Sequence, residues 1–541
     1  MSTPLQSDRA PRSAVPEWSL VLLLTGAAAA LQATRLPFRW NQICLAYASY
    51  FKEYQHSIEV EGWSAALTTF VGLHPPLYSL LFHGLETWGS SPLVWLSLSG
   101  ALSVASVPVV WKAGRLLFPD EPRVAWLAAI VLAISPHRVA YGLEINNYPL
   151  TVFAISIQLL AFSAYSTAVQ RSTGGHIRAG FFWAAATSFA LWSHVLCATL
   201  PLAQVLVIVF TPAFRRQLRS VFLCMGATLI SCLPLLPSLL VGGDAPPINQ
   251  AVGILGALES GFLDFPGRYG STLGAYLLGL AACAGALRLS FGKSPDRLVG
   301  RALVAHLLLT GTLVLFLVAR GVAASHQFPY YLALLPTASL LIAAGASKTG
   351  PRLLSRATLL FVAAGLLLHA AALGTDALKG WQVVQSAPTE RALMGRAIEE
   401  WTADSTLVLI DFPSWGDDDK DVLDATWALL TKTEVVDFAH PEVPTLVTAD
   451  PYWGQPVRVG GNRWLYTFTG WPPSDGSTSR MDVIANHVLA TGGKLIVALY
   501  NTDQAHGDFA QAEAWAMRRG ELARSAPAQA LWVIKSEGAE D

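Results

Sequence analysis

Long apolar stretches dominate the chain between Trp18 and Gly374, and this pattern predicts a polytopic α-helical membrane protein. A bilayer core about 30 Å thick requires roughly 20 apolar residues per helix. The stretch from Pro75 to Trp88 is shorter, so it predicts a juxtamembrane or re-entrant helix rather than a full crossing. The predicted transmembrane helices, about 11 in number, are 17–34, 92–112, 123–141, 148–168, 179–196, 197–212, 220–240, 272–290, 300–319, 329–346 and 353–374.

The density of charge changes at one point in the chain. Only 13% of the residues are charged, against about 25% in an ordinary soluble domain, and the deficit ends after Asp376. We therefore predict a cytoplasmic tail (1–16), a transmembrane domain (17–375) with a large first outer loop (35–91), and a C-terminal soluble domain (376–541). The net charge of -1 lacks the basic excess of a nucleic-acid-binding protein.

Lys and Arg residues set the predicted orientation, because they are enriched in cytoplasmic loops. With eleven spans and a cytoplasmic N-terminus, every basic connection lies in the cytoplasm and the C-terminal domain lies outside. The first apolar run follows Arg9 and Arg12 but lacks a cleavage site, so it is predicted to be an uncleaved helix. The basic connections carry Lys112, Arg115 and Arg123; Arg171 and Arg178; Arg215, Arg216 and Arg219; Arg288, Lys293, Arg297 and Arg301; and Lys348, Arg352 and Arg356.

Polar side chains gather in the predicted outer loops, near the membrane boundary. In the first loop, His74 precedes two prolines that can open a helix. Polar groups at the hydrocarbon edge are costly unless they face one another or a cavity, so we predict a shared outer cavity. Each residue alone is also compatible with an interfacial anchor or a solvated loop position. The later loops contribute His137, Arg138, Glu144, Asn146, Asn147 and Tyr148, then Asp264 and Arg268, then His326, Tyr330 and Tyr331.

Strands and helices alternate in the C-terminal domain, which predicts a small α/β fold. Asp417 to Asp419 could bind a cation, or they could begin a solvated helix. The five cysteines form no CxxC pair, which argues against a zinc site or a disulfide framework. The predicted strands are 406–411, 434–438, 464–469, 493–500 and 530–535, and the predicted helices are 421–431, 481–490 and 508–519.

Four motifs follow one another along the predicted outer loops: Asn41-Gln42, His74-Pro75-Pro76-Leu77, Ser135-Pro136 with Glu144 to Tyr148, and Pro329-Tyr330-Tyr331 before Leu335-Pro336. Their order resembles the GT-C superfamily of polyprenyl-phosphate-sugar-dependent glycosyltransferases. That family has an Asp-Glu pair in its first outer loop, then Lys- or His-Pro-Pro-Leu, then Ser-Pro with Glu-x-Arg-x-Tyr, and later Arg-Tyr before Leu-x-x-x-Pro. The likeness is greatest to the branch of lipid A aminoarabinose transferases and protein O-mannosyltransferases, and it covers roughly residues 15–375.

The resemblance implies roles for individual residues. In the family, the first-loop acid is the general base, while the Lys or His before the prolines and nearby arginines bind the donor phosphate. Here neutral Asn41 and Gln42 stand at the acid positions, so Glu144, which matches a family Glu, becomes the first candidate for the catalytic carboxylate. The resemblance implies no metal site and no certain cofactor, and it leaves a divalent cation open. The candidate substrate- and phosphate-binding residues are His74, Arg138, Tyr148, Arg268, His326 and Tyr330.

The sequence therefore predicts a glycosyltransferase of a bacterial inner membrane. It would move a sugar from a polyprenyl-phosphate carrier to an extracytoplasmic acceptor, which could be an envelope lipid, a glycan or a protein. Because the acid pair is neutral, a catalytically altered or inactive homologue that binds lipid-linked glycan or scaffolds envelope assembly is the alternative. A transporter is the third hypothesis, and the absence of internal repeats and mid-span charges argues against it.

Overall fold

The structure is a computed structural model of the whole chain. The described residues divide into two compact units, of which the first ends at Leu378 within the last long helix, and each unit is described by itself. The structure describes residues 17–34, 67, 75–86, 92–170, 176–211, 217–237, 255, 257–258, 270–291, 297–320, 328–347 and 352–386, and then 406–411, 457–458, 464–468, 494–500, 516–526 and 529–534.

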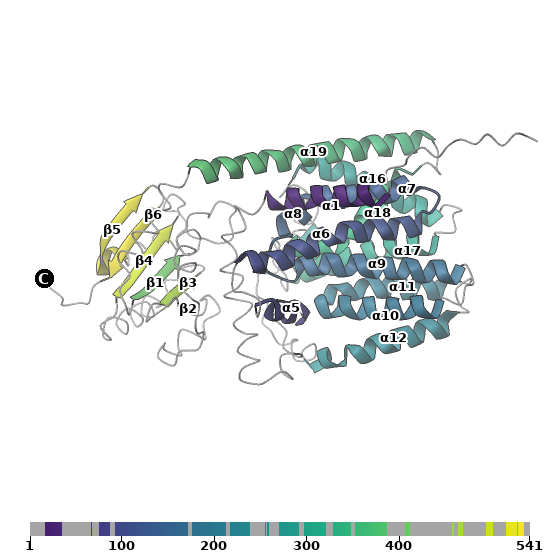
Figure 1. Cartoon of the computed structure of the whole chain (residues 1–541), viewed down its shortest axis with the longest axis horizontal. Coiled ribbons are helices and arrows are strands. Elements are labelled where there is room, and N and C mark those ends of the chain that lie inside the picture. The colour runs from purple at the N-terminus through teal and green to yellow at the C-terminus, as the bar shows by residue number, and fades with distance from the viewer. Residues whose placement is uncertain are drawn as a thin grey trace, which may run out of the picture. The chain divides into compact units, whose positions relative to one another are not determined.

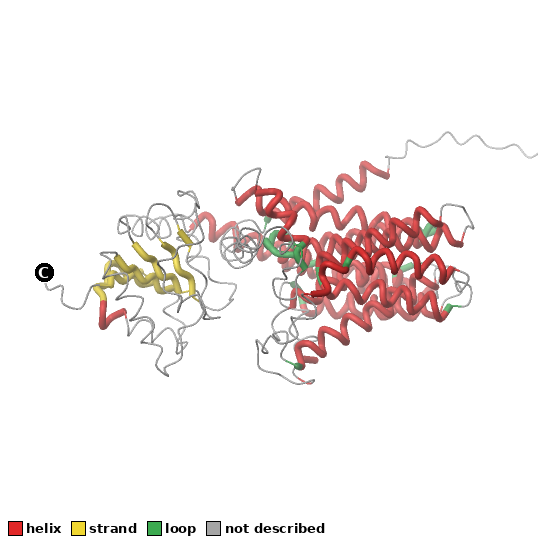
Figure 2. Tube along the Cα trace, turned by 90° about the horizontal axis from the view of Figure 1, so that it is seen from below, coloured by secondary structure: helices red, strands yellow, loops and turns green. Residues whose placement is uncertain are grey.

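The first unit is a bundle of helices that run side by side (Figures 1 and 2). Among the described residues, α6, α9, α16, α17 and α19 contain segments long and apolar enough to cross a membrane. The longer helices are α1 (Glu17–Ala33), α6 (Pro92–Leu117), α7 (Pro122–Ile134), α9 (Tyr148–Gln170), α10 (His176–Ser193), α11 (Thr199–Phe210), α12 (Leu218–Ser231), α16 (Thr272–Phe291), α17 (Arg297–Ala319), α18 (Leu335–Gly345) and α19 (Arg352–Ser386). The shorter ones are α5 (Leu77–Glu86), α8 (Pro136–Tyr141) and the 3₁₀ helices η1 (Val195–Ala198), η3 (Leu233–Leu235) and η6 (Phe328–Leu334).

Each predicted span overlaps one of the longer helices. The division predicted between the spans 179–196 and 197–212 is confirmed, since α10 ends at Ser193 and η1 begins at Val195. The helix α5 begins directly after Pro75 and Pro76, as the prolines predict. Three predicted helices were wrong at a boundary: the one over 123–141 ends at Ile134, the one over 220–240 ends at Ser231, and the one over 329–346 opens as the 3₁₀ helix η6. The number of membrane crossings stays a prediction.

Contacts at the helix termini define two ends of the bundle. At the motif end, Gln32 from α1 meets the connection after α7, and the Ser99 hydroxyl of α6 reaches the carbonyl of Glu144. At the basic end, Arg115 Nη2 of α6 lies 3.4 Å from Glu17 Oε1 of α1. The helix α6 therefore runs from the motif end to the basic end, and α7 returns to the motif end. That the motif end faces the outside of the membrane stays a prediction.

The helices of the bundle are apolar on nearly every side, which is typical of segments that face lipid on one side and protein on the other. Outward-facing leucines remain exposed on α1, α12, α16 and α19. Small residues allow close packing within the bundle. A Cβ at Gly285 of α16 would collide with the Leu341 carbonyl of α18, so only glycine permits these two backbones to approach so closely.

A buried polar cluster joins α9, α10 and α11 in the middle of the bundle. The Gln204 amide oxygen accepts hydrogen bonds from Gln158 Nε2 at 2.6 Å and from Trp183 Nε1 at 2.8 Å. Gln204 Nε2 returns a bond to Gln158 Oε1 at 3.1 Å. All three side chains are fully buried. Hydrogen bonds of this kind hold transmembrane helices together where apolar contacts with lipid and with protein are of similar strength.

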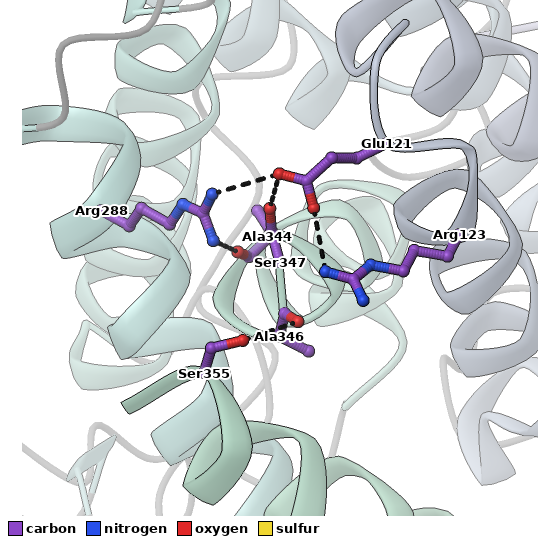
Figure 3. A network of polar contacts seen from close by, with 7 residues as sticks. All are labelled: Glu121, Arg123, Arg288, Ala344, Ala346, Ser347 and Ser355. Carbon is purple, nitrogen blue, oxygen red and sulfur yellow. Dashed lines mark hydrogen bonds and ion pairs between the residues drawn. The ribbon is translucent and has the colours of Figure 1, made fainter. Parts of the chain in front are cut away.

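A second polar network lies at the basic end (Figure 3). Glu121 lies in the connection between α6 and α7, with Oε2 3.3 Å from Arg123 Nη2 and Oε1 3.5 Å from Arg288 Nη2. Ser347, just after α18, donates its hydroxyl to the same carboxylate, and Arg288 Nη1 donates to the Ala344 carbonyl at 3.1 Å. The network joins the ends of α7, α16 and α18, and it confirms that these arginines share one side of the bundle.

The described part of the second unit contains one six-stranded sheet with the order β2-β3-β1-β4-β6-β5. The central strand β1 pairs in parallel with β3 and β4, while β2 with β3, β4 with β6, and β5 with β6 are antiparallel. The strands are β1 (Thr406–Asp411), β2 (Val457–Arg458), β3 (Trp464–Phe468), β4 (Lys494–Tyr500), β5 (Gly520–Ala526) and β6 (Gln529–Ile534).

Four predicted strands are confirmed as β1, β3, β4 and β6, while β2 and β5 were not predicted. The predicted helix over 508–519 is helical in its described part, 516–519, and β5 follows it at once. The predicted strand 434–438, the helices 421–431 and 481–490, and the acidic turn at Asp417 to Asp419 lie outside the described residues. The α/β class of this unit therefore stays a prediction.

Candidate functional site

The connection between α7 and α9 forms the centre of the motif end. The helix α7 ends at Ile134, and Ser135 then caps α8 by accepting a hydrogen bond from the Arg138 backbone amide. Pro136 occupies the first turn of α8, where a missing N–H is tolerated. After Gly142 the chain runs through residues 143–147 to the start of α9 at Tyr148. This connection carries Glu144, the predicted catalytic carboxylate.

Hydrogen bonds fix Glu144 through both its side chain and its backbone. Asn146 Nδ2 donates to Glu144 Oε2 at 2.6 Å, a short bond typical of an ionised acceptor. The Ser99 hydroxyl donates to the Glu144 carbonyl at 2.6 Å and lies 2.7 Å from the Tyr78 hydroxyl. Because Ser99 uses its hydrogen on Glu144, Tyr78 is the donor in the second bond. Helices α5 and α6 thus hold the backbone that carries a half-buried carboxylate.

Asn146 and Asn147 attach the same connection to the neighbouring helices. Asn146 Oδ1 accepts a hydrogen bond from the Tyr148 backbone amide at 2.9 Å, which satisfies a donor at the start of α9. Asn147 Nδ2 donates to the Ser193 carbonyl, the last residue of α10, at 3.0 Å. The Asn147 carbonyl accepts the Thr151 amide at 2.8 Å. The hydrogen bonds of Asn146 and Asn147 therefore fix both the first residue of α9 and the orientation of the Glu144 side chain.

A row of rings continues from this connection across the motif end. Tyr141 and Tyr148 have centroids 6.0 Å apart, Tyr148 and His194 6.3 Å, and His194 and Tyr330 6.0 Å. All four rings are buried. His194 Nδ1 accepts the Leu196 backbone amide at 3.1 Å, so a neutral His194 carries its proton on Nε2. The row joins α8, α9, the start of η1 and η6, so it brings the predicted motif around Glu144 to Tyr148 close to the one at Tyr330.

Arg138 points into the protein. Its Nε donates to the Leu132 carbonyl at 3.0 Å and its Nη2 to the Ala133 carbonyl at 2.8 Å, and both carbonyls belong to the last turn of α7. Its Nη1 donates to Gln32 Oε1 and to the Ser103 hydroxyl, each at 3.0 Å. The side chain is buried, and these contacts make it the C-terminal cap of α7. They do not support the predicted phosphate-binding role of Arg138.

Electrostatics at the motif end follow from burial. Burial lowers the pKa of Arg138 to about 10, which leaves the guanidinium protonated at neutral pH. Burial also raises the pKa of the Tyr78 hydroxyl above its ordinary value, although the bond with Ser99 opposes this shift. Tyr78 is therefore neutral and can donate its proton to Ser99 throughout the physiological range. Within the described ranges no group of three or more His, Cys, Asp or Glu side chains could hold a metal ion.

The structure brings together only part of the predicted site. Glu144, Tyr148 and Tyr330 lie at the motif end, with the aromatic pair linked through His194. Five predicted residues lie outside the described residues: Asn41, Gln42, His74, Arg268 and His326. Four contributors were missed at the level of sequence: Gln32, Tyr78, Ser99 and His194. In the sequence, His194 stands between two apolar spans. This position indicated a division between two helices but no role for the His194 side chain.

These contacts and the bundle of long apolar helices define a polytopic membrane protein. The fold is similar to ArnT from Cupriavidus metallidurans bound to undecaprenyl phosphate, with a TM-score of 0.53 and 12% sequence identity over 95% of this chain and 98% of that chain. An oligosaccharyltransferase from Archaeoglobus fulgidus, in the apo form, gives a TM-score of 0.43 at 12% identity, over 75% of this chain and 64% of that one. No family model and no curated protein matches the sequence.

Proposed function

We propose that this protein is a membrane glycosyltransferase that moves a sugar from a polyprenyl-phosphate carrier to an extracytoplasmic acceptor. The observation that carries the proposal is the half-buried Glu144 carboxylate, held by Asn146 and by the Ser99–Tyr78 pair at the motif end of a GT-C fold. The similar ArnT structure contains undecaprenyl phosphate, and the likeness extends over 95% of this chain. In this proposal the motif end faces the outside of a bacterial inner membrane.

Glu144 would act as the general base on the acceptor nucleophile. It would take over the role of the family's acid pair, whose positions in this chain hold Asn41 and Gln42. The bond from Asn146 fixes the side-chain torsions of Glu144, so the carboxylate is already oriented when the acceptor arrives. His74, Arg268 and His326 are the proposed contacts of the donor phosphate, where positive charge would stabilise the leaving group. Tyr148 and Tyr330 would line the sugar-binding side of the same site.

The test uses the full chain in lipid nanodiscs, with wild type and Glu144→Gln compared. Each is incubated with undecaprenyl-phosphate-linked sugars, and the release of undecaprenyl phosphate is followed by mass spectrometry. Loss of a general base is expected to slow release by about 10²–10⁴-fold, while binding of undecaprenyl phosphate is retained. Glu17→Gln, a carboxylate at the basic end, is the matched control and should keep wild-type release. Equal release by Glu144→Gln and wild type would exclude Glu144 as the base.

One observation favours a second candidate, a homologue without transferase activity that binds lipid-linked glycan. The acid positions of the family read Asn41 and Gln42, neither of which accepts a proton at neutral pH. In that case wild type and Glu144→Gln would both bind undecaprenyl phosphate, and neither would release it from a lipid-linked sugar. Failure of the wild type to bind undecaprenyl phosphate would contradict both candidates.

A further inference from the structure

Two buried hydrogen-bond donors at the basic end have no acceptor. Trp111 and Arg115 lie one turn apart on α6, so their side chains share one face of the helix. The Trp111 indole is 3% exposed, and its Nε1 has no hydrogen-bond partner. Arg115 Nη1 is buried and equally without a partner, although its Nη2 lies 3.4 Å from Glu17 Oε1. Buried donors are nearly always paired, so this pair points to an acceptor supplied from outside the chain.

The surroundings of these donors are those of a membrane boundary. The Trp18 ring of α1 packs edge-on against Trp111 with centroids 5.4 Å apart, and the Trp126 ring of α7 lies with its centroid 5.6 Å from that of Trp111. Trp18 is 61% exposed, and tryptophans with one side exposed are typical of the headgroup level of a bilayer. On the same helix Leu22 and Leu23 are each 69% exposed. An apolar surface therefore leads directly to the polar site.

The charge at the site suits a phosphodiester. Arg115 supplies a guanidinium, and Lys112 on the same helix is exposed and supplies a second positive charge. Glu17 balances part of this charge, so the site as a whole is only weakly basic. An indole N–H and a guanidinium N–H are both good donors to a phosphate oxygen. A water molecule could also accept these hydrogen bonds, but it would not cover the exposed leucines of α1.

We propose that the basic end holds one membrane phospholipid at the seam of α1, α6 and α7. The phosphodiester oxygens accept hydrogen bonds from Trp111 Nε1 and Arg115 Nη1, and the acyl chains lie along the exposed leucines of α1. The site is separate from the motif end and does not depend on the transferase proposal. Its occupant fastens α1, a helix with only one narrow buried stripe, to the rest of the bundle.

Native mass spectrometry of the detergent-purified full chain tests this proposal with phosphatidylglycerol as the probe. Trp111→Phe removes the indole N–H and keeps an aromatic ring. The most tightly bound phosphatidylglycerol molecule should therefore bind about tenfold more weakly to this variant than to wild type. Trp126→Phe is the matched control, because it changes a half-buried indole of the same ring cluster, and it should bind as wild type does. Arg115→Lys keeps the charge beside Glu17 but loses the forked donor, so it should also weaken binding.

Three results would overturn the proposal. The first is equal phosphatidylglycerol affinity for Trp111→Phe and wild type, with Trp111→Phe eluting as a folded monodisperse protein. The second is displacement of the lipid by millimolar inorganic phosphate, which would mean that the site recognises the anion alone. The third is a wild-type protein that retains no phospholipid, which would leave a water molecule as the acceptor.

Discussion

Replacing Gly142 by alanine tests whether packing at the motif end is as tight as the contacts indicate. Gly142 has φ −69° and ψ −14°, a right-handed helical conformation that alanine adopts without strain. Any destabilisation must therefore come from the space that a Cβ needs. A Cβ here would lie 2.5 Å from Gln32 Nε2 and from the Ser103 hydroxyl, and it would also collide with Gln32 Oε1.

The size of the effect follows from how firmly Gln32 is held. Its Nε2 donates to the Val139 carbonyl at 2.9 Å, and its Oε1 accepts from Arg138 at 3.0 Å and from Ser103 at 3.1 Å. Gln32 therefore cannot move aside without losing bonds. Overpacking a filled site costs about 1–3 kcal/mol, and one weakened buried hydrogen bond adds about 1 kcal/mol. We expect Gly142→Ala to lower the free energy of unfolding by about 2–4 kcal/mol.

The free energy of unfolding can be measured by SDS titration of the protein in mixed micelles, with tryptophan fluorescence as the signal. Gly26→Ala is the control, because Gly26 lies in the same helix as Gln32 and no atom lies within 4 Å of its added Cβ. It should be neutral or stabilising by up to about 1 kcal/mol. In a Gln32→Ala background the cost of Gly142→Ala should fall by about 1 kcal/mol or more. The same cost in both backgrounds, or no cost in wild type, would refute the reasoning.

Two further changes address the centre of the bundle and the support of Glu144. Gln204→Met removes the acceptor shared by Gln158 and Trp183. In the same SDS titration, the free energy of unfolding should therefore fall by about 1–3 kcal/mol. The double variant with Gln158→Met should recover part of this loss. Burial raises the pKa of Tyr78, so the folded state keeps this proton when the unfolded state releases it near pH 10. The stability that comes from Tyr78 should therefore be constant below about pH 10 and fall as the pH rises further. The variant Tyr78→Phe should melt at a lower temperature than wild type at pH 8. Between pH 9 and pH 11 it should lose less stability than wild type does.

The apolar pattern predicted the helices of the bundle well, because a helix in lipid must be apolar along its whole length. The same pattern could not predict the role of Arg138. Its partner Gln32 is 106 residues away and its partner Ser103 is 35 residues away, so only the folded chain shows that they meet. A loop arginine that caps the preceding helix has the same local sequence as one that binds phosphate.

Strand β5 was missed for a related reason. Its sequence, Gly-Glu-Leu-Ala-Arg-Ser-Ala, lacks the β-branched and aromatic residues that favour strands. It forms by pairing along β6, from Gly520 opposite Ile534 to Ala526 opposite Gln529, with one register shift near Leu522. Pairing with a neighbouring strand overrides a weak local preference, and the local sequence does not carry that information.

Two neutral residues at positions where the family that the sequence resembles has arginines make contacts that support our proposal of a transferase over its inactive alternative. Asn146 stands at one of these positions, and its two side-chain atoms hold Glu144 and the first amide of α9. Tyr330 also replaces an arginine, and its ring completes the row that begins at Tyr141. A site released from selection would be expected to lose such mutual support first, because each of these bonds needs a partner from another segment. The described part of the motif end keeps it, with Glu144 at its centre.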